Sequence, residues 1–271
     1  MAIGKRGPAS DACSDCSDSP VELSADTKAL LDLFLANKAE EERRFAVLEE
    51  AAQLRKMEVD VPLTVEELQE LKDTPMVSVA EFKSTFGEDW QLSQFWYSED
   101  YAYRLAKALH DQCTPETKIA FLCCPTAYVA FQHTKPLPNA RLFEYDQRFA
   151  VLSPKQFVFY DLDDPEDIPE IYKGHFDFII ADPPFLNETT NRKLLRTLKT
   201  IVNPKGCKIL LHTSTEMENN GTLAKVYTEP PFGPLKRTAF EPEHGQLAND
   251  FASWGNWEGA ETFGKDYGDG A

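Results

Sequence analysis

The tetrapeptide Asp182-Pro183-Pro184-Phe185 is the segment of this sequence with the clearest chemical potential. It directly follows an apolar run, residues 176–181, that has the composition of a buried strand. Two prolines fix the backbone and lack N–H groups, so neighbouring carbonyl oxygens and the Asp182 carboxylate can together accept hydrogen bonds from an amino group. Phe185 adds an aromatic face that suits a base or a cation. Ordinary turn chemistry is the alternative explanation for Asp and Pro at a strand end.

Further acidic residues end two other strand-like runs. Glu144 and Asp146 close the run 141–145, about 20 residues after the preceding run, and an acid at this offset takes up ribose hydroxyls in nucleotide-binding α/β units. Because side chains alternate along a strand, both can point the same way, and either can serve. Asp161 ends the run 157–160, where it can accept a hydrogen bond from an adenine amino group. The alternatives are solvent-facing acids or, for Asp161, a helix N-cap.

Several familiar motifs are missing from the sequence. The first apolar run continues as Cys123-Cys124-Pro125-Thr126, without a glycine-rich phosphate loop. This argues against a pyrophosphate cradle and is compatible with an adenosyl ligand that lacks phosphates. Cys13 and Cys16 have no second Cys or His pair at zinc spacing, so no metal site is expected. None of the five histidines, including His212 at a strand end, has a recognisable Cys or Ser partner, and we interpret them as structural or surface residues.

A sheet is needed to bring these strand ends together. Short apolar runs have the composition of strands at residues 118–124, 141–145, 157–160, 176–181 and 208–212, and two more strands are expected around 223–227 and 250–254. Several runs are apolar throughout, as is typical of strands covered on both faces in a parallel α/β sheet. The segments between them can form crossover helices, of which the clearest are 99–112 and 191–202. The pattern predicts an α/β domain that binds its ligand at the carboxyl ends of the strands.

The N-terminal part of the chain has a different composition. Residues 24–57 carry apolar side chains at helical spacing, and a capping box at Thr64 to Glu67 predicts a short helix at 65–72. This acidic helical extension either packs one stripe on the main domain as a solvated arm or docks a partner. We divide the chain into a disordered N-terminus, the extension, a main domain and a flexible tail, at residues 1–23, 24–85, 86–257 and 258–271.

The charge balance restricts the class of partner. The chain has 28 Lys and Arg against 45 Asp and Glu, a net charge of −17. Nucleic-acid binding depends on neutralising phosphates with basic side chains, so a nucleic-acid partner is disfavoured and a basic protein partner is favoured. No apolar run approaches the roughly 20 residues of a membrane span, and residues 1–24 lack the apolar core of a secretory signal. The cysteine usage fits a reducing compartment, and we expect a cytoplasmic protein.

The sequence resembles the class I S-adenosylmethionine-dependent amino methyltransferases, which carry [DNS]-P-P-[YFW] after their fourth strand. A longer set of segments narrows this resemblance: Trp90-Gln-Leu-Ser-Gln-Phe-Trp-Tyr-Ser98, Phe143-Glu-Tyr-Asp-Gln-Arg-Phe149, Ile180-Ala-Asp-Pro-Pro-Phe185 and Leu247-Ala-Asn-Asp-Phe251. In this order they are similar to the eukaryotic lysine methyltransferases of translation elongation factor 1-alpha, a group formerly described as N6-adenine DNA methyltransferases. The resemblance implies a Rossmann-like seven-stranded class I methyltransferase sheet, S-adenosylmethionine as cofactor, elongation factor 1-alpha as protein substrate and a monomeric enzyme.

The resemblance also implies how the cofactor is held. Glu144, with Asp146 as the alternative, holds the ribose of S-adenosylmethionine. Asp161 contacts the adenine, and Cys124 with Pro125 forms the turn that replaces a glycine loop.

The acceptor side of the site follows from the same resemblance. The segment Gln94-Phe95-Trp96 closes over the methionine end of the cofactor or the target channel. Asp182, which also borders the cofactor, holds with Pro183 and Phe185 the nitrogen that receives the methyl group. A neutral amine displaces the methyl group from the sulfonium, with Asp182 orienting N–H groups and Phe185 favouring the cationic amine.

Two other functions stay open at this point. An N6-adenine nucleic-acid methyltransferase would share the chemistry of the tetrapeptide, and it could use the basic side chains Arg192, Lys193, Arg196 and Lys199 of one predicted helix. A non-catalytic scaffold with a methyltransferase fold is the other alternative.

Overall fold

The computed structural model describes residues 24–245, 247 and 250–267 with the exception of 55–75, and it leaves out the side chains of 51–54. The predicted disorder of residues 1–23 and the predicted helix at 65–72 therefore lie outside the described residues. The chain divides into two units, residues 1–39 and 40–271. No helix of the described residues is long and apolar enough to cross a membrane.

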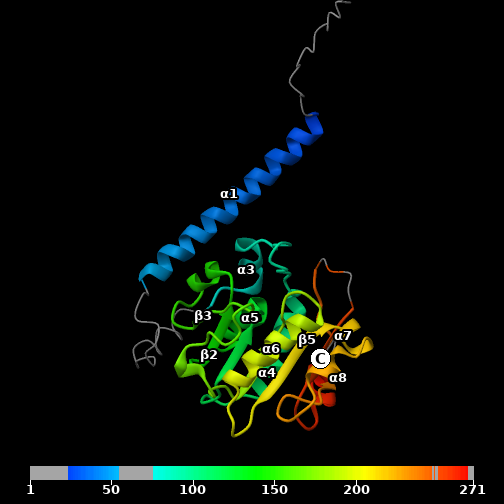
Figure 1. The fold of residues 1–271 in the computed structure, drawn as a ribbon. Coiled ribbons are helices and arrows are strands. Elements are labelled where there is room, and N and C mark those ends of the chain that lie inside the picture. Colours follow the sequence, from blue (N-terminus) through cyan, green and yellow to red (C-terminus); the bar gives the residue numbers. More distant parts are fainter. Residues whose placement is uncertain (1–23, 55–75, 246, 248–249, 268–271) are drawn as a thin grey trace, which may run out of the picture. The chain divides into compact units, whose positions relative to one another are not determined.

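A seven-stranded sheet in the order β3-β2-β1-β4-β5-β7-β6 forms the centre of the larger unit (Figure 1). The strands are β1 Ile119–Leu122, β2 Ala140–Glu144, β3 Phe157–Phe159, β4 Phe178–Ala181, β5 Lys208–Ser214, β6 Lys236–Arg237 and β7 Phe251–Gly255. β1 to β5 run parallel, and β7 is antiparallel to β5 and β6. The predicted Rossmann-like seven-stranded sheet is confirmed. Its order reverses between β1 and β4, and ligands of open α/β sheets bind outside the carboxyl ends of the strands at such a point.

Helices cover both faces of this sheet (Figure 1). In the larger unit these helices are α3 Val79–Thr85, α4 Glu99–Asp111, α5 Pro125–Thr134 and α6 Glu188–Ile201, followed by the short α7 Glu216–Asn219 and α8 Thr222–Val226. Helix α1, Ala25–Leu54, has residues in both units. One core cluster joins α3, α4 and α5 to one sheet face, and a second joins α6 and α8 to the other. β1 supplies both clusters, because Ile119 and Phe121 face the first and Ala120 and Leu122 the second. This double burial explains why the strands are apolar throughout.

Local capping explains where the helices begin. Ser98 caps α4, as its hydroxyl accepts a hydrogen bond from the Tyr101 N–H at 3.2 Å. α6 starts earlier than the predicted residue 191, because the side chain of Asn187 accepts from the Thr190 N–H at 2.9 Å. The strand predicted around 223–227 is wrong. This segment is α8, which buries Leu223 and Val226 one helical turn apart.

The main unit extends beyond the range expected from sequence at both ends. α3 lies before residue 86, yet its Val79 and Phe82 are fully buried in the first core cluster. Within the same unit Phe45 and Leu48 of α1 pack against this cluster, whereas Leu30 and Phe34 of the first unit are exposed. In the expected flexible tail, Phe263 is only 8% exposed and contacts the ring of Phe240. Aromatic burial therefore incorporates both flanking segments into the core.

Candidate active site

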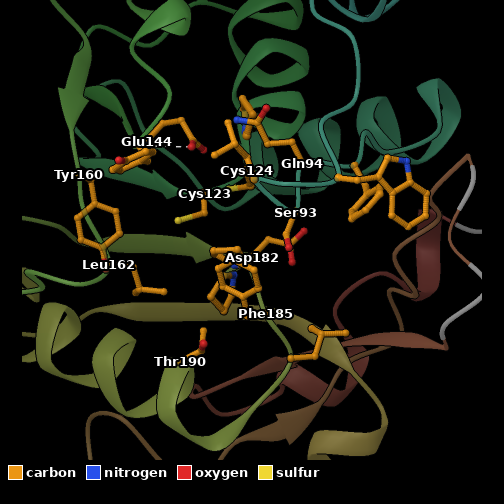
Figure 2. A pocket seen from close by; sticks show the side chains of 18 of the residues that line it. Ser93, Gln94, Cys123, Cys124, Glu144, Tyr160, Leu162, Asp182, Phe185 and Thr190 are labelled. Carbon is orange, nitrogen blue, oxygen red and sulfur yellow. Dashed lines mark hydrogen bonds between the residues drawn. The ribbon is translucent and has the colours of Figure 1, made fainter. Parts of the chain in front are cut away.

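A cavity of about 820 Å³ opens at the carboxyl ends of β1, β2, β3 and β4. Its walls come from the segment 90–97, the turns after these strands, the start of α6 and part of the segment 244–251. Figure 2 shows Glu144 and Tyr160 on one side of the cavity and Asp182 with Phe185 on another. The volume falls in the range of small-molecule sites in proteins. Of the residues that the resemblance assigns to the cofactor or the acceptor, only Asp146 does not line the cavity.

Glu144 is a buried carboxylate at the end of β2. One of its oxygens, Oε1, accepts hydrogen bonds from the N–H groups of Tyr145 at 2.9 Å and Asp146 at 3.4 Å. Burial raises the pKa of Glu144 to about 7 in spite of these bonds. The second oxygen has the chemistry to accept from ligand hydroxyl groups. Glu144 therefore fits the ribose position better than Asp146, whose carboxylate is paired with Arg148 at 2.6 Å.

The residues expected to contact the adenine and to form the turn without a glycine loop line the same cavity as Glu144. Asp161 and Tyr160 follow β3 and line the cavity, as Cys124 and Pro125 do after β1. The chain turns sharply there because Cys123 adopts a left-handed φ of 56°, and α5 begins at Pro125 without a side-chain cap. Proline suits the first helical position, because it has no N–H group that would need a hydrogen-bond partner there.

The segment Gln94-Phe95-Trp96 borders the cavity with residues that play different parts. The ring of Trp96 packs against Phe82 and its indole N–H donates to the Phe86 carbonyl at 2.7 Å, so it is anchored in the core. Gln94 donates through Nε2 to the Asp146 carboxylate at 3.2 Å. The ring of Phe95 meets the exposed ring of Trp90 edge-to-face at 4.7 Å, beside the cavity.

Asp182 lies at the end of β4, and its side chain is 15% exposed. Burial raises its pKa to about 7, while a hydrogen bond from the Tyr97 hydroxyl at 2.5 Å acts in the opposite direction. Pro183 and Pro184 lead to Phe185, which has a left-handed φ of 58° and is 55% exposed. A strained backbone at a non-glycine residue costs free energy, and here it turns an exposed phenyl ring toward the cavity (Figure 2).

A polar network beneath Asp182 was not singled out from the sequence. Tyr97 also contacts Nδ1 of His212 at 2.9 Å, and Nε2 of His212 contacts the Tyr101 hydroxyl at 3.3 Å. His244 approaches from another segment, with its Nε2 4.0 Å from Asp182. The signal available in the sequence was a histidine in the middle of an apolar strand, because a buried imidazole requires polar partners.

Three of the four basic side chains of α6 are paired with acids. Arg192 contacts Glu188 at 2.6 Å, Lys193 contacts Asp163 at 2.5 Å, and Arg196 contacts Glu166 at 2.9 Å. Most of this cationic charge is therefore balanced locally, which weakens the case for a phosphate-binding helix.

The sheet order, the cavity at its switch point and the turn after β4 define a Rossmann-like methyltransferase. Comparison with known proteins gives the family: a model described as Probable N6-adenine methyltransferase matches residues 88–259. The chain belongs to this family and is an enzyme of the methyltransferase class.

Curated relatives in this family carry protein-lysine methyltransferase names. Protein-lysine N-methyltransferase EFM5 of Saccharomyces cerevisiae is 38% identical over 187 residues, 64% of this chain and 73% of that protein. EEF1A lysine methyltransferase 1 of Homo sapiens is 36% identical over 174 residues, 63% of this chain and 76% of that protein. A protein-lysine N-methyltransferase of Caenorhabditis elegans is 31% identical over 255 residues, 90% of this chain and 97% of that protein. Among solved structures, a branched-chain polyamine synthase from Thermus thermophilus covers 70% of this chain and 62% of its own, at a TM-score of 0.44 and 13% identity.

Proposed function

We propose that this enzyme transfers a methyl group from S-adenosylmethionine to a lysine side chain of translation elongation factor 1-alpha. The observation that carries the proposal is a largely buried carboxylate, Asp182, at the end of β4 beside an exposed aromatic ring, Phe185, within one cavity. The names of the curated relatives support lysine as the acceptor and elongation factor 1-alpha as the substrate.

The residues around the cavity fit S-adenosylmethionine. Glu144 offers a buried acceptor for ribose hydroxyls, and Asp161 lies after the next strand, where an adenine amino group needs an acceptor. The turn at Cys124 and Pro125 supplies no glycine-rich loop, and a cofactor without phosphates needs none. When bound, the cofactor supplies an electrophilic methyl group on a sulfonium.

Asp182 has two tasks toward a lysine acceptor. An ammonium group must lose a proton before its nitrogen can attack, and an ordinary lysine has a pKa near ~10.4. A carboxylate whose pKa is raised to about 7 is a better proton acceptor than an ordinary aspartate, so Asp182 can take that proton as well as orient the amine. Phe185 favours the cationic amine on arrival by about 0.5–2 kcal/mol. Pro183 holds the turn between them.

The charge of the protein supports a protein substrate over a nucleic acid. A net charge of −17 repels phosphate backbones, and the ion pairs of α6 balance most of its basic side chains. Four cysteines of the described residues are free, which is compatible with a reducing compartment, and we propose the cytoplasm as location.

Transfer of labelled methyl groups tests the function. The protein is incubated with labelled S-adenosylmethionine and either purified elongation factor 1-alpha or unmethylated duplex DNA. Asp182→Asn should abolish transfer. Asp177→Asn, at the opposite end of β4, is the matched control and should retain it, because the Asp177 carboxylate accepts from the Lys118 N–H and the Asn203 side chain and does not line the cavity. Label on the protein factor supports the proposal, and mass spectrometry then locates the lysine. Label on DNA alone contradicts the substrate, and label on neither leaves the scaffold alternative.

A further inference from the structure

We propose that Tyr97 is a positioning residue for Asp182, and that His212 in its Nδ1–H tautomer fixes the direction of the hydrogen bond that Tyr97 donates. The role of Asp182 toward an amine rests on the proposed function. The hydrogen-bond direction does not, because it follows from counting donors and acceptors in the structure.

The carboxylate of Asp182 sets the direction of the hydrogen bonds that lead to it. An ionised Asp182 can only accept, so the single hydroxyl proton of Tyr97 points to Oδ2 of Asp182 across 2.5 Å. The Tyr97 oxygen then has only lone pairs to offer to His212, 2.9 Å away. Nδ1 of His212 must therefore carry a proton. A neutral imidazole has one N–H, so Nε2 is the acceptor for the Tyr101 hydroxyl at 3.3 Å. Each hydrogen bond in this series, from Tyr101 through His212 and Tyr97, is therefore donated in the direction of Asp182.

Burial keeps the two tyrosines and the histidine of this hydrogen-bonded series uncharged. Tyr97 is 2% exposed, and Tyr101 and His212 are fully buried. Burial lowers the pKa of His212 to about 3 and raises the pKa of both tyrosines well above their ordinary value. An imidazolium would have to donate from both nitrogens, and among the described residues its hydrogen-bond partners are the two neutral tyrosines. The neutral tautomer is therefore stable over the working pH range.

The three hydrogen-bonded side chains are positioned by different parts of the tertiary structure. Tyr97 precedes α4, its carbonyl accepts from Nζ of Lys83 at 3.1 Å, and its backbone bridges to His244. Tyr101 lies on α4 and His212 on β5. Rigid elements of this kind locate a side chain more closely than a loop does. With Oδ2 bound by Tyr97, the other oxygen, Oδ1, is left to accept from the amine.

The proposal predicts a pH effect, for which the surrounding groups matter. The titratable groups around Asp182 are Tyr97, Tyr101 on α4, His212 on β5, His244 and, after β1, Cys123 and Cys124. Burial lowers the pKa of His244 to about 4 and raises the pKa of both cysteines well above their ordinary value. These neighbours are all neutral between pH 6 and 9, so Asp182 is the group in this set that titrates there.

The first test observes the tautomer directly. ¹⁵N NMR of the histidine-labelled full chain, with His212→Asn for assignment, distinguishes a protonated Nδ1 from a protonated Nε2. We expect protonated Nδ1 and bare Nε2 at pH 8 to 9, where Asp182 is ionised. A protonated Nε2 would overturn the proposal whether or not the protein methylates any substrate, so this test is independent of the proposed function.

The second test measures the effect on Asp182. Tyr97→Phe removes only the hydroxyl and should lower kcat by about 10-fold or more, since bonds to charged groups are the stronger ones. S-adenosylhomocysteine should bind within about 2-fold of the wild type. The acid limb of the kcat profile should move to higher pH, because the lost bond had lowered the pKa of Asp182. Tyr227→Phe, which removes a buried hydroxyl bonded to Asn191 at 3.0 Å, is the control and should leave kcat and the limb unchanged.

A pair of substitutions separates positioning from packing. His212→Asn keeps an N–H donor near the position of Nδ1 and should retain much of kcat, whereas His212→Leu has no donor and should resemble Tyr97→Phe. Thermal unfolding of each variant checks that it folds. Equal kcat for the Asn and Leu variants, or an unmoved acid limb in Tyr97→Phe, contradicts the positioning role. Wild-type protein that methylates nothing while Nδ1 is protonated would contradict the proposed function alone.

Discussion

Arg148 holds both carboxylate oxygens of Asp146, through Nε at 3.0 and 2.9 Å and through Nη2 at 2.6 Å from Oδ2. Hydrogen bonds from Arg148 and Gln94 help to lower the pKa of Asp146 despite its burial. Glu144, two residues earlier, has no such partner among the described residues and faces the cavity. The two acids, which the sequence left as alternatives, therefore differ in what they can offer a ligand.

The first prediction concerns cofactor binding. Glu144→Gln should weaken S-adenosylhomocysteine binding at pH 8.5 by about 10–100-fold, because a carboxylate acceptor for ribose hydroxyls is replaced by an amide. Asp146→Asn is the matched control and should change the dissociation constant by less than about 3-fold. Isothermal titration calorimetry measures both. A larger effect of Asp146→Asn would transfer the ribose role to Asp146.

The same binding reaction should depend on pH. The ionised form of Glu144 accepts hydroxyl groups best, and its pKa is raised to about 7. Wild-type affinity should therefore rise as the pH increases through about 7 and then level off, and Glu144→Gln should be flatter. A wild-type affinity that is constant from pH 6 to 8.5 would argue against contact between this carboxylate and the ligand.

The second prediction is that the Asp182 carboxylate lowers the stability of the folded protein. The pKa of Asp182 is raised in the folded protein, so stability is lost as the pH rises through about 7. Asp182→Asn should raise the free energy of unfolding at pH 8.5 by on the order of 2 kcal/mol and Tm by about 5 °C. The gain should shrink toward pH 5. Thermal unfolding without cofactor measures it, with Asp177→Asn as control.

The third prediction concerns the exposed ring beside Asp182. Phe185→Leu keeps an apolar side chain but removes the aromatic face, and it should lower kcat/KM for the protein substrate by about 3–30-fold. Phe185→Tyr keeps the face and should retain activity. Because Phe185 is 55% exposed, Tm should change little. Phe159→Leu, 45% exposed and outside the cavity lining, is the control. Equal effects at both positions would exclude a specific contact.

The fourth prediction tests whether α3 belongs to the cooperative core. The Ser78 hydroxyl accepts from Glu81 N–H at 3.2 Å, and Glu81 accepts from Ser78 N–H at 2.8 Å. Ser78→Ala should lower the free energy of unfolding by about 1 kcal/mol and Tm by about 3 °C. Ser84→Ala, at a partly exposed position of α3, should have a smaller effect. An unchanged Tm for Ser78→Ala would mean that α3 unfolds separately from the sheet.

Much of the fold could be predicted from the sequence, because burial on both faces leaves a continuous apolar signal in a strand. β1 to β5 and β7 match predicted runs, and α4 matches its predicted range to within a residue. The segment 223–227 was misassigned since a short apolar run does not distinguish a strand from a buried helix. The flanking segments with Val79 and Phe263 were assigned outside the domain because their composition is polar apart from single aromatic or apolar anchors.

The sequence by itself determined the chemistry available to the site: a carboxylate, prolines and an aromatic ring after one strand, and acids after two others. Only the tertiary structure decided which acid is free, since the partners of Asp146 come from Arg148 and from Gln94, 52 residues away. It alone also joined Tyr97 to Asp182 and His212, across separations of 85 and 115 residues. A hydrogen bond is made or lost when the distance between donor and acceptor changes by a fraction of an ångström, and it also requires a donor that has no other partner. The local sequence pattern encodes neither of these conditions.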